Sequence, residues 1–151
     1  MDKYDRKIIA CLGENARISY AELARRVNLS APAVAERIDK LERAGVITGY
    51  RVGVDPAKIG RPIVCLIELT VKHLEFYATV AQLRAMPEVV ECYAITGTGG
   101  LLIKVAMESM AELQALIARL MEFGDTRTSI VIDTPVPPRL PSLPSDEAGE
   151  D

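Results

Sequence analysis

The sequence predicts an α+β protein with an N-terminal three-helix helix-turn-helix (winged-helix-like) domain and a C-terminal ferredoxin-like βαββαβ domain. Three observations support this prediction. Apolar residues recur at helical spacing through residues 1–50. A four-residue corner separates the second and third helical stretches. Beyond a turn-rich connector, residues 63–133 alternate between strand-like and helix-like stretches in the order β-α-β-β-α-β.

The first two predicted helices lie within residues 1–27. The first helix ends near Gly13. Its apolar stripe at helical spacing consists of Tyr4, Ile8, Cys11 and Leu12. A second helix begins at Ser19, where Ser19 and Glu22 have the spacing of a capping box that satisfies two backbone N–H groups. Its inner stripe is expected to consist of Leu23, Ala24 and Val27.

A third helix is predicted between Ser30 and Gly45. Ser30 is a typical N-cap, and Pro32 is tolerated in a first turn because the N–H groups there lack intrahelical partners. The stripe Val34, Ile38 and Leu41 repeats at helical spacing, and Gly45 supplies a left-handed stop.

The corner between the second and third helices indicates a helix-turn-helix. Residues 27–30 are too few for anything but a tight corner, and Asn28 tolerates the left-handed conformation that such a corner needs. Ala24 is small where two crossing helices approach, and Val34 can pack the third helix against the second. A plain helical hairpin with the same spacing is the alternative.

Several motifs of this region resemble the Lrp/AsnC (feast/famine) family of transcription regulators. The resemblance rests on Asp5-Arg6-Lys7-Ile8, Asn15-Ala16-Arg17, Glu22-Leu23-Ala24, Asn28-Leu29-Ser30, Arg37-Ile38, Leu41-Glu42 and residues 45–50. It implies a sequence-specific DNA-binding transcriptional regulator with double-stranded DNA as its partner.

A helix-turn-helix places its second helix in the major groove, which defines the candidate contacts. A helical wheel directs the residues opposite the apolar stripe toward DNA, and the base-edge candidates are Ser30, Ala31, Pro32 and Glu36. Phosphate candidates are the nearby cations Arg25, Arg26, Arg37, Lys40 and Arg43. Each of these charges could instead belong to an ordinary solvated face. If Arg37 contacts a phosphate, replacing it with Ala weakens binding to all DNA sequences and lowers the salt dependence of binding.

The remaining chain divides into a connector, a second domain and a tail. Residues 51–62 form a linker with a short strand at residues 50–54, and residues 63–133 form the ferredoxin-like domain. Its predicted strands span residues 63–71, 89–95, 101–107 and 128–133. One helix spans residues 76–86 with Phe76, Val80 and Leu83 inward, and another follows the cap Ser109. Residues 134–151 are Pro-rich and acidic, and a disordered extension is predicted.

Two helices cover one face of such a sheet, but the first strand is apolar on both faces. Val64 and Leu66 occupy the register opposite that of Cys65 and Ile67. Association through the uncovered face would remove these side chains from water, so a homodimer is expected. The family resemblance, which extends through residues 89–93 and 101–105, implies further assembly of dimers into tetramers or octamers.

The resemblance also implies a small-molecule site at the turn between the second and third strands. The candidate effector-binding residues are Thr96, Gly97, Thr98, Gly99 and Gly100. The family usually has an aspartate and an aromatic residue after the Thr-Gly pair, and both are absent here. Glycines still permit close approach of the backbone to an amino acid or related metabolite. The alternative is a hairpin turn without a ligand.

Composition argues against several other classes of protein. The net charge of −3 is divided unequally, with +2 on residues 1–50 and −5 on the rest, which suits a DNA-facing N-terminal part. The charged residues near Met1 and the lack of a long apolar stretch predict neither a secretory signal nor a membrane span. Three cysteines without C-x-x-C spacing indicate buried reduced thiols, and a cytoplasmic location is expected.

Enzymatic function is not predicted, and neither a metal site nor a cofactor is expected. No nucleophile–base pair, metal cluster or phosphate-binding loop is recognisable in the sequence. The sirohaem decarboxylases resemble the same two-domain family, but His73 is the single histidine and follows a predicted strand. An architectural DNA-binding protein that responds to no effector is the other alternative.

Overall fold

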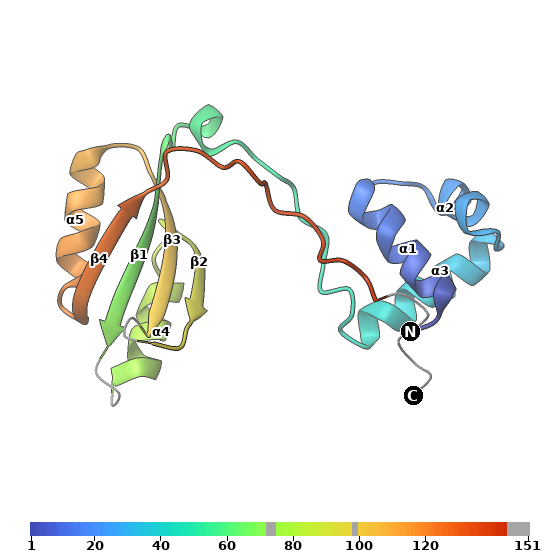
Figure 1. The fold of residues 1–151 in the computed structure, drawn as a ribbon, viewed down its shortest axis with the longest axis horizontal. Coiled ribbons are helices and arrows are strands. Elements are labelled where there is room, and N and C mark those ends of the chain that lie inside the picture. Colours follow the sequence, from blue (N-terminus) through green and yellow to red (C-terminus); the bar gives the residue numbers. More distant parts are fainter. Residues whose placement is uncertain (72–74, 98–99, 145–151) are drawn as a thin grey trace. The chain divides into compact units, whose positions relative to one another are not determined.

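The computed structural model describes residues 1–71, 75–97 and 100–144 in two compact units. The helical unit comprises Met1–Val52 with the C-terminal segment that begins at Val136. The sheet unit comprises Gly53–Pro135. Figure 1 shows the helices of the first unit and the strands and helices of the second. His73, Thr98 and Gly99 lie outside the described residues.

Each of the three N-terminal helices begins at a side chain that caps its first turn. Helix α1 spans Lys3–Glu14, α2 spans Tyr20–Val27 and α3 spans Ala31–Arg43. Ser19 and Ser30 accept backbone N–H groups of α2 and α3, as predicted. The reciprocal capping box, however, is formed at α1 by Asp2 and Asp5, not by Ser19 and Glu22. Glu22 instead pairs with two arginines of its own helix, because an exposed carboxylate can reach cations three and four residues ahead.

The corner between α2 and α3 has the predicted geometry. Asn28 has φ 56° and ψ 50°, and the Leu29 N–H donates to the carbonyl oxygen of Ala24 at 3.0 Å. The left-handed conformation and this hydrogen bond reverse the chain at Asn28, so the apolar stripes of α2 and α3 pack against each other. The resulting core contains Ile8, Leu23, Ala24, Val27, Val34, Ile38 and Leu41.

The predicted short strand at residues 50–54 is wrong. The chain is irregular there, and a short 3₁₀ helix, η1, follows at Pro56–Ile59. Val52 is 87% exposed and Val54 is 54% exposed, so these alternating apolar side chains are not buried against another element. A strand needs a neighbour to accept its backbone hydrogen bonds, and no described strand lies against this segment.

The sheet unit has the predicted βαββαβ order. Strand β1 spans Ile63–Val71, β2 spans Val89–Ala94, β3 spans Leu101–Met107 and β4 spans Gly124–Ile130. The strands are antiparallel in the order β2-β3-β1-β4. β4 begins four residues earlier than predicted, because its polar start at Gly124 pairs with Val71 of β1.

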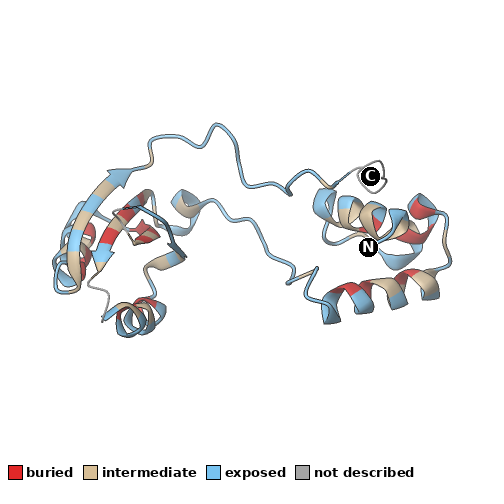
Figure 2. Cartoon of the chain, turned by 60° about the horizontal axis from the view of Figure 1, so that its bottom comes forward, coloured by how far each residue is buried: buried red, intermediate tan, exposed pale blue. Residues whose placement is uncertain are grey.

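Both helices of the sheet unit pack on one face of the sheet. Helix α4 spans Phe76–Arg84 and α5 spans Met110–Leu120. The shared core is formed by Cys65, Ile67, Leu69, Leu83, Met86, Leu101, Ile103, Val105, Met107, Leu113, Leu116 and Leu120. Figure 2 shows this buried layer between the helices and the strands. Of the α4 residues predicted to face inward, Leu83 is buried, whereas Phe76 and Val80 are half-buried.

No helix or loop of the described sheet unit packs against the centre of its opposite face. Leu66 is 37% exposed and Tyr93 is 52% exposed on this face, although each lies within a paired strand. The alternating register places these side chains together on the face: Val64, Leu66, Glu68, Glu91, Tyr93, Leu102, Lys104 and Ala106. We call this set the open sheet face.

Candidate nucleic-acid interface and effector cavity

The N-terminal turn of α3 presents short side chains to solvent. Ser30, Pro32 and Glu36 are exposed and Ala31 is half-buried, so the predicted base-edge residues share one accessible end of the helix. Ser30 Oγ already accepts the Ala33 N–H at 3.3 Å and therefore caps the helix. Alanine and proline offer apolar contact to a thymine methyl but no bidentate hydrogen bond, which leaves much of the sequence reading to DNA shape.

Most of the predicted phosphate contacts are paired with carboxylates. Arg25 pairs with Glu22, Arg26 with Glu22 and Glu14, and Arg43 with Asp39. These arginine side chains are between 46% and 78% exposed, and exposed pairs of this kind contribute little and exchange readily for a phosphate. Lys40 is exposed and forms no ion pair with any residue that the structure describes.

Arg37 differs from the other four cations because it joins α3 to the start of α1. Its Nη1 atom donates to Asp2 Oδ2 and to Asp5 Oδ1, each at 2.7 Å. The guanidinium also lies 5.4 Å from the centre of the Tyr4 ring, within the range of a cation–π contact. Its side chain is 30% exposed and that of Asp5 is 16% exposed. Arg37 therefore links α3 to the first turn of α1 within the helical unit.

Sequence reasoning did not find these partners of Arg37. Asp2 and Asp5 stand 35 and 32 residues before Arg37, and no local spacing rule connects them. The hydrogen bond from the Asp5 backbone N–H, and then the Arg37 side chain, hold the pKa of Asp2 below its usual value. The same two carboxylates raise the pKa of Arg37.

We expect Arg37→Ala to destabilise the helical unit by about 1 kcal/mol at pH 7, because a partly screened double ion pair is lost. A lowered pKa stabilises the fold above the unfolded value of about 4, and this contribution disappears as the pH falls through the folded value. The difference between wild type and variant should therefore shrink as the pH is lowered below about 4. Urea unfolding at several pH values measures this difference in the free energy of unfolding.

A DNA titration of the same variant separates positioning from phosphate contact. With Arg37 engaged by Asp2 and Asp5, we expect the salt dependence of binding to stay unchanged, in contrast to the expectation from sequence alone. Arg119→Ala is the matched control, since it removes an ion-paired arginine of the sheet unit. A lower salt dependence together with unchanged stability would assign Arg37 to phosphate.

The segment after α3 is held to that helix by a tyrosine. The Tyr50 hydroxyl donates to Glu42 Oε1 at 2.9 Å. Burial, and then the hydrogen bond with Glu42, raise the pKa of Tyr50 to about 12. The phenol therefore remains a protonated donor at physiological pH.

The described part of the predicted effector turn consists of Thr96, Gly97 and Gly100. Thr96 and Gly97 are exposed, and both glycines have positive φ, 100° at Gly97 and 74° at Gly100. The Ile95 N–H donates to the Gly100 carbonyl oxygen at 2.9 Å and closes the hairpin. These three residues supply backbone groups and one hydroxyl, but no charge.

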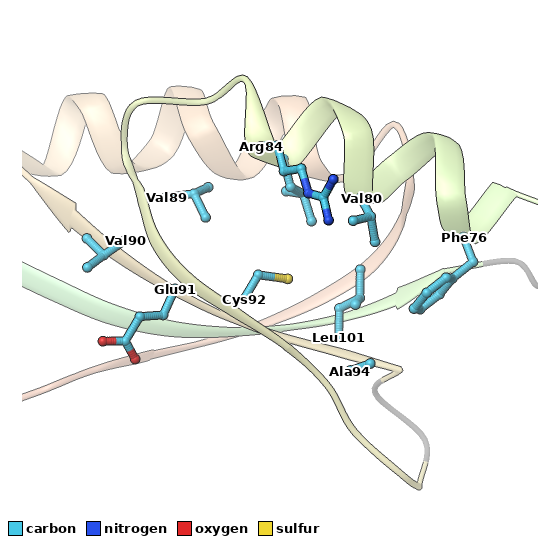
Figure 3. A pocket seen from close by; sticks show the side chains of 10 residues that line it. Phe76, Val80, Arg84, Val89, Val90, Glu91, Cys92, Ala94 and Leu101 are labelled. Atoms are coloured by element: carbon cyan, nitrogen blue, oxygen red, sulfur yellow. The ribbon is translucent and has the colours of Figure 1, made fainter. Parts of the chain in front are cut away.

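A cavity of about 460 Å³ lies between α4 and β2, beside this turn. Ala94 and Leu101, which flank the turn, form part of its wall. Its other lining residues are Phe76, Val80, Leu83, Arg84, Val89, Val90, Glu91 and Cys92. Figure 3 shows the Arg84 guanidinium between α4 and β2, with the Cys92 sulfur directed into the same space. The cavity explains why Phe76 and Val80 are only half-buried.

Two charged residues, Arg84 and Glu91, are among the lining residues, but the Glu91 carboxylate is turned toward Lys104 and Tyr93 of the open sheet face (Figure 3). Arg84 forms no ion pair with any described residue. Glu91 lies 3.5 Å from Lys104 Nζ and accepts a hydrogen bond from the Tyr93 hydroxyl. Cys92 is exposed rather than buried as predicted, but the partial burial of its thiol raises the pKa of that thiol, which is therefore protonated at neutral pH. A small molecule with a carboxylate and an apolar part would match Arg84 and the apolar lining residues.

The structure shows neither a metal centre nor a membrane helix within residues 1–71, 75–97 and 100–144. No group of three potential His, Cys, Asp or Glu ligands is close enough there to hold a metal ion. No helix in these ranges has the length and apolar character needed to cross a bilayer.

Comparison with known protein families assigns one family to the N-terminal helices and a second to the sheet unit and part of the segment after it. A family described as "Winged helix-turn-helix DNA-binding" matches residues 1–48. A second family, described as "Lrp/AsnC ligand binding domain", matches residues 64–141. Each match covers one unit's principal elements.

Individual relatives match along nearly the whole chain. The regulatory protein AsnC of Escherichia coli K12 is 36% identical over 141 residues, covering 90% of this chain and 93% of AsnC. The structure of LrpC from Bacillus subtilis has a TM-score of 0.84 at 31% identity, covering 89% of this chain and 96% of LrpC. A transcriptional regulator from Neisseria meningitidis, solved in complex with L-Met, has a TM-score of 0.86 at 26% identity and covers 93% and 96%.

Proposed function

This chain belongs to the Lrp/AsnC family and is a DNA-binding transcription regulator rather than an enzyme, and we propose that it binds DNA as a homo-oligomer that responds to an amino acid. The observation that carries the proposal is the pairing of a helix-turn-helix unit with a sheet unit. The helical unit has an accessible recognition helix, and the sheet unit has both the open sheet face, with Leu66 and Tyr93 exposed, and a cavity with a cation at its wall.

The N-terminal end of α3 is proposed to read the major groove. Ser30, Ala31, Pro32 and Glu36 are the candidates for base edges, and their exposure supports this assignment. The phosphate contacts are assigned to Lys40 and, after exchange of their surface ion pairs, to Arg25, Arg26 and Arg43. Arg25 and Arg26 lie on α2 and add positive charge beside α3, whose own net charge is zero.

Replacing Lys40 with Gln is the simplest test of the phosphate assignment. We expect the slope of log K against log salt to fall in magnitude by about 1, with a similar loss of affinity for every DNA sequence. Fluorescence anisotropy at several salt concentrations measures both quantities. Lys58→Gln, an exposed lysine on η1 of the sheet unit, is the matched control. Equal slopes for the two variants would argue against a phosphate contact at Lys40.

A homodimer is proposed to form through the open sheet face. Two copies of that face can cover each other's Leu66 and Tyr93, which one chain leaves exposed. Such a dimer presents two recognition helices to half-sites about one helical turn of DNA apart, or multiples of that distance. Further assembly into tetramers or octamers, as implied by the family resemblance, would add recognition helices and affinity.

The effector is proposed to be an amino acid bound in the cavity beside the turn. Arg84 would hold its carboxylate, and Phe76, Val80 and Leu101 would contact an apolar side chain. Backbone groups of Thr96, Gly97 and Gly100 are close to this wall because Ala94 and Leu101 flank the turn. The complex of the Neisseria relative with L-Met supports this class of ligand. Binding alters assembly or DNA affinity only if it favours one of two states.

We expect Arg84→Gln to weaken amino-acid binding by roughly 10- to 100-fold, because a charge-assisted hydrogen bond in a partly apolar site is lost. Isothermal titration calorimetry with the twenty amino acids, starting with methionine, identifies the ligand and gives the affinity. Arg17→Gln in the helical unit is the control and should bind as the wild type does. If no amino acid produces heat or changes the oligomer size, the effector proposal fails, whereas the DNA assignment stands.

One observation favours an effector-independent architectural protein as the second candidate. The described turn residues carry no acidic side chain, unlike the aspartate-containing turn usual in the family. Selection of bound genomic fragments with and without amino acids distinguishes the two functions. A regulator yields a few sites that change with the ligand, and an architectural protein yields many sites that do not.

A further inference from the structure

Gly13 lies inside α1, where its own backbone gives no reason for a glycine. The helix continues through Gly13 to Glu14, and the Asn15 N–H donates to the Cys11 carbonyl oxygen at 3.0 Å. Gly13 is not among the glycines with positive φ. Glycine is a poor helix former, so this position is expected to favour alanine unless something outside the helix occupies the space of a side chain.

The side chain of Leu140 occupies that space. A Cβ built on Gly13 would overlap Leu140 Cδ1, and it would lie 3.0 Å from Leu140 Cγ. Leu140 also borders two hollows of the helical unit. One is lined by Ile9, Leu12, Gly13, Ala16 and residues 46–51, together with Pro138–Leu140, and the other by Ala10, Gly13 and Glu14, together with Leu140, Pro141 and Leu143.

This packing differs from the disordered tail predicted from composition. Residues 136–144 have no helix or strand, yet they belong to the helical unit. Prolines at 137, 138, 141 and 144 restrict this segment to extended backbone before it docks. A preorganised segment loses less conformational entropy on docking, so a contact made mainly by one leucine can persist within the same chain.

We propose that residues 136–144 form a strap that docks on the helical unit through Leu140. The absence of a side chain at Gly13 leaves the space that Leu140 occupies. The strap holds the chain against α1 ten residues after the end of β4.

The test uses the opposite signs that one substitution should have in two backgrounds. In full-length protein, Gly13→Ala should lower the melting temperature of the helical unit, because the new methyl group meets Leu140. In Leu140→Ser protein, the same Gly13→Ala change should raise it by about 3–6 °C, the ordinary benefit of alanine in a helix. The melting temperature of the helical unit is measured from the hydrogen exchange of α1 peptides at increasing temperature.

A second measurement reports docking directly. Trypsin cleaves after Arg139, beside Leu140, and a docked strap protects this bond. We expect Gly13→Ala, which is remote in sequence from the bond, to accelerate its cleavage at least about threefold. Gly53→Ala is the matched control, because a Cβ there meets nothing within 4 Å.

Two results would overturn the strap. The first is an equal change in melting temperature from Gly13→Ala in the wild-type and Leu140→Ser backgrounds, which would mean that Leu140 does not occupy the site in solution. The second is an unchanged rate of cleavage after Arg139 in Gly13→Ala protein. Neither result depends on DNA or on an amino acid, so the strap can fail while the proposed function stands.

Discussion

Leu66→Asp is expected to convert the proposed oligomer into monomers and to weaken DNA binding by roughly 100-fold or more, because binding through several linked recognition helices is lost. Leu66 lies in the middle of β1 on the open sheet face, where its side chain is 37% exposed. A carboxylate there remains solvated in a monomer but would be buried between two sheets. The same change therefore penalises association and spares the fold.

The register of the sheet makes this substitution tolerable for a single chain. Leu66 stands directly opposite Lys104 of β3, and an Asp–Lys cross-strand pair is favourable. Light scattering should give the mass of one chain, and circular dichroism should be unchanged. Tyr77→Asp is the control, since Tyr77 is 86% exposed on α4, which packs on the other face of the sheet. A Leu66→Asp protein that remains oligomeric would exclude the open sheet face as the interface.

Gly124→Ala is expected to destabilise the sheet unit by about 2–3 kcal/mol, since a methyl group is forced against backbone. Gly124 opens β4 and pairs with Val71 at the end of β1. A Cβ at this position would overlap the Thr70 carbonyl oxygen and lie 2.9 Å from the Thr70 carbonyl carbon. No rotamer change relieves a clash with backbone, so the ends of the two strands must separate.

Chemical denaturation measures this loss as a lower midpoint with an unchanged m value. Gly53→Ala again provides a matched control, because glycine at that position has open space around it and no positive φ. A variant at Gly124 with wild-type stability would show that β4 begins later than Gly124, as the sequence pattern alone suggests.

The helix-turn-helix was predictable because its determinants are local. Ala24, Asn28 and Val34 lie within eleven consecutive residues, and each acts on the corner that joins α2 to α3. The βαββαβ order was predictable for a similar reason, since apolar periodicity changes at each boundary of the sheet unit. β4 was placed too late because its first half is polar and is defined by pairing with β1.

The sequence by itself therefore determined the two-domain α+β fold, the recognition helix and the family. Only the tertiary structure decided that Arg37 binds Asp2 and Asp5, that Phe76 and Val80 border a cavity with Arg84, and that residues 50–54 are not a strand. Helical and strand periods act between near neighbours, so they can be read along the chain. An ion pair, a cavity or a strand pairing joins residues far apart in sequence, and folding alone brings those residues together.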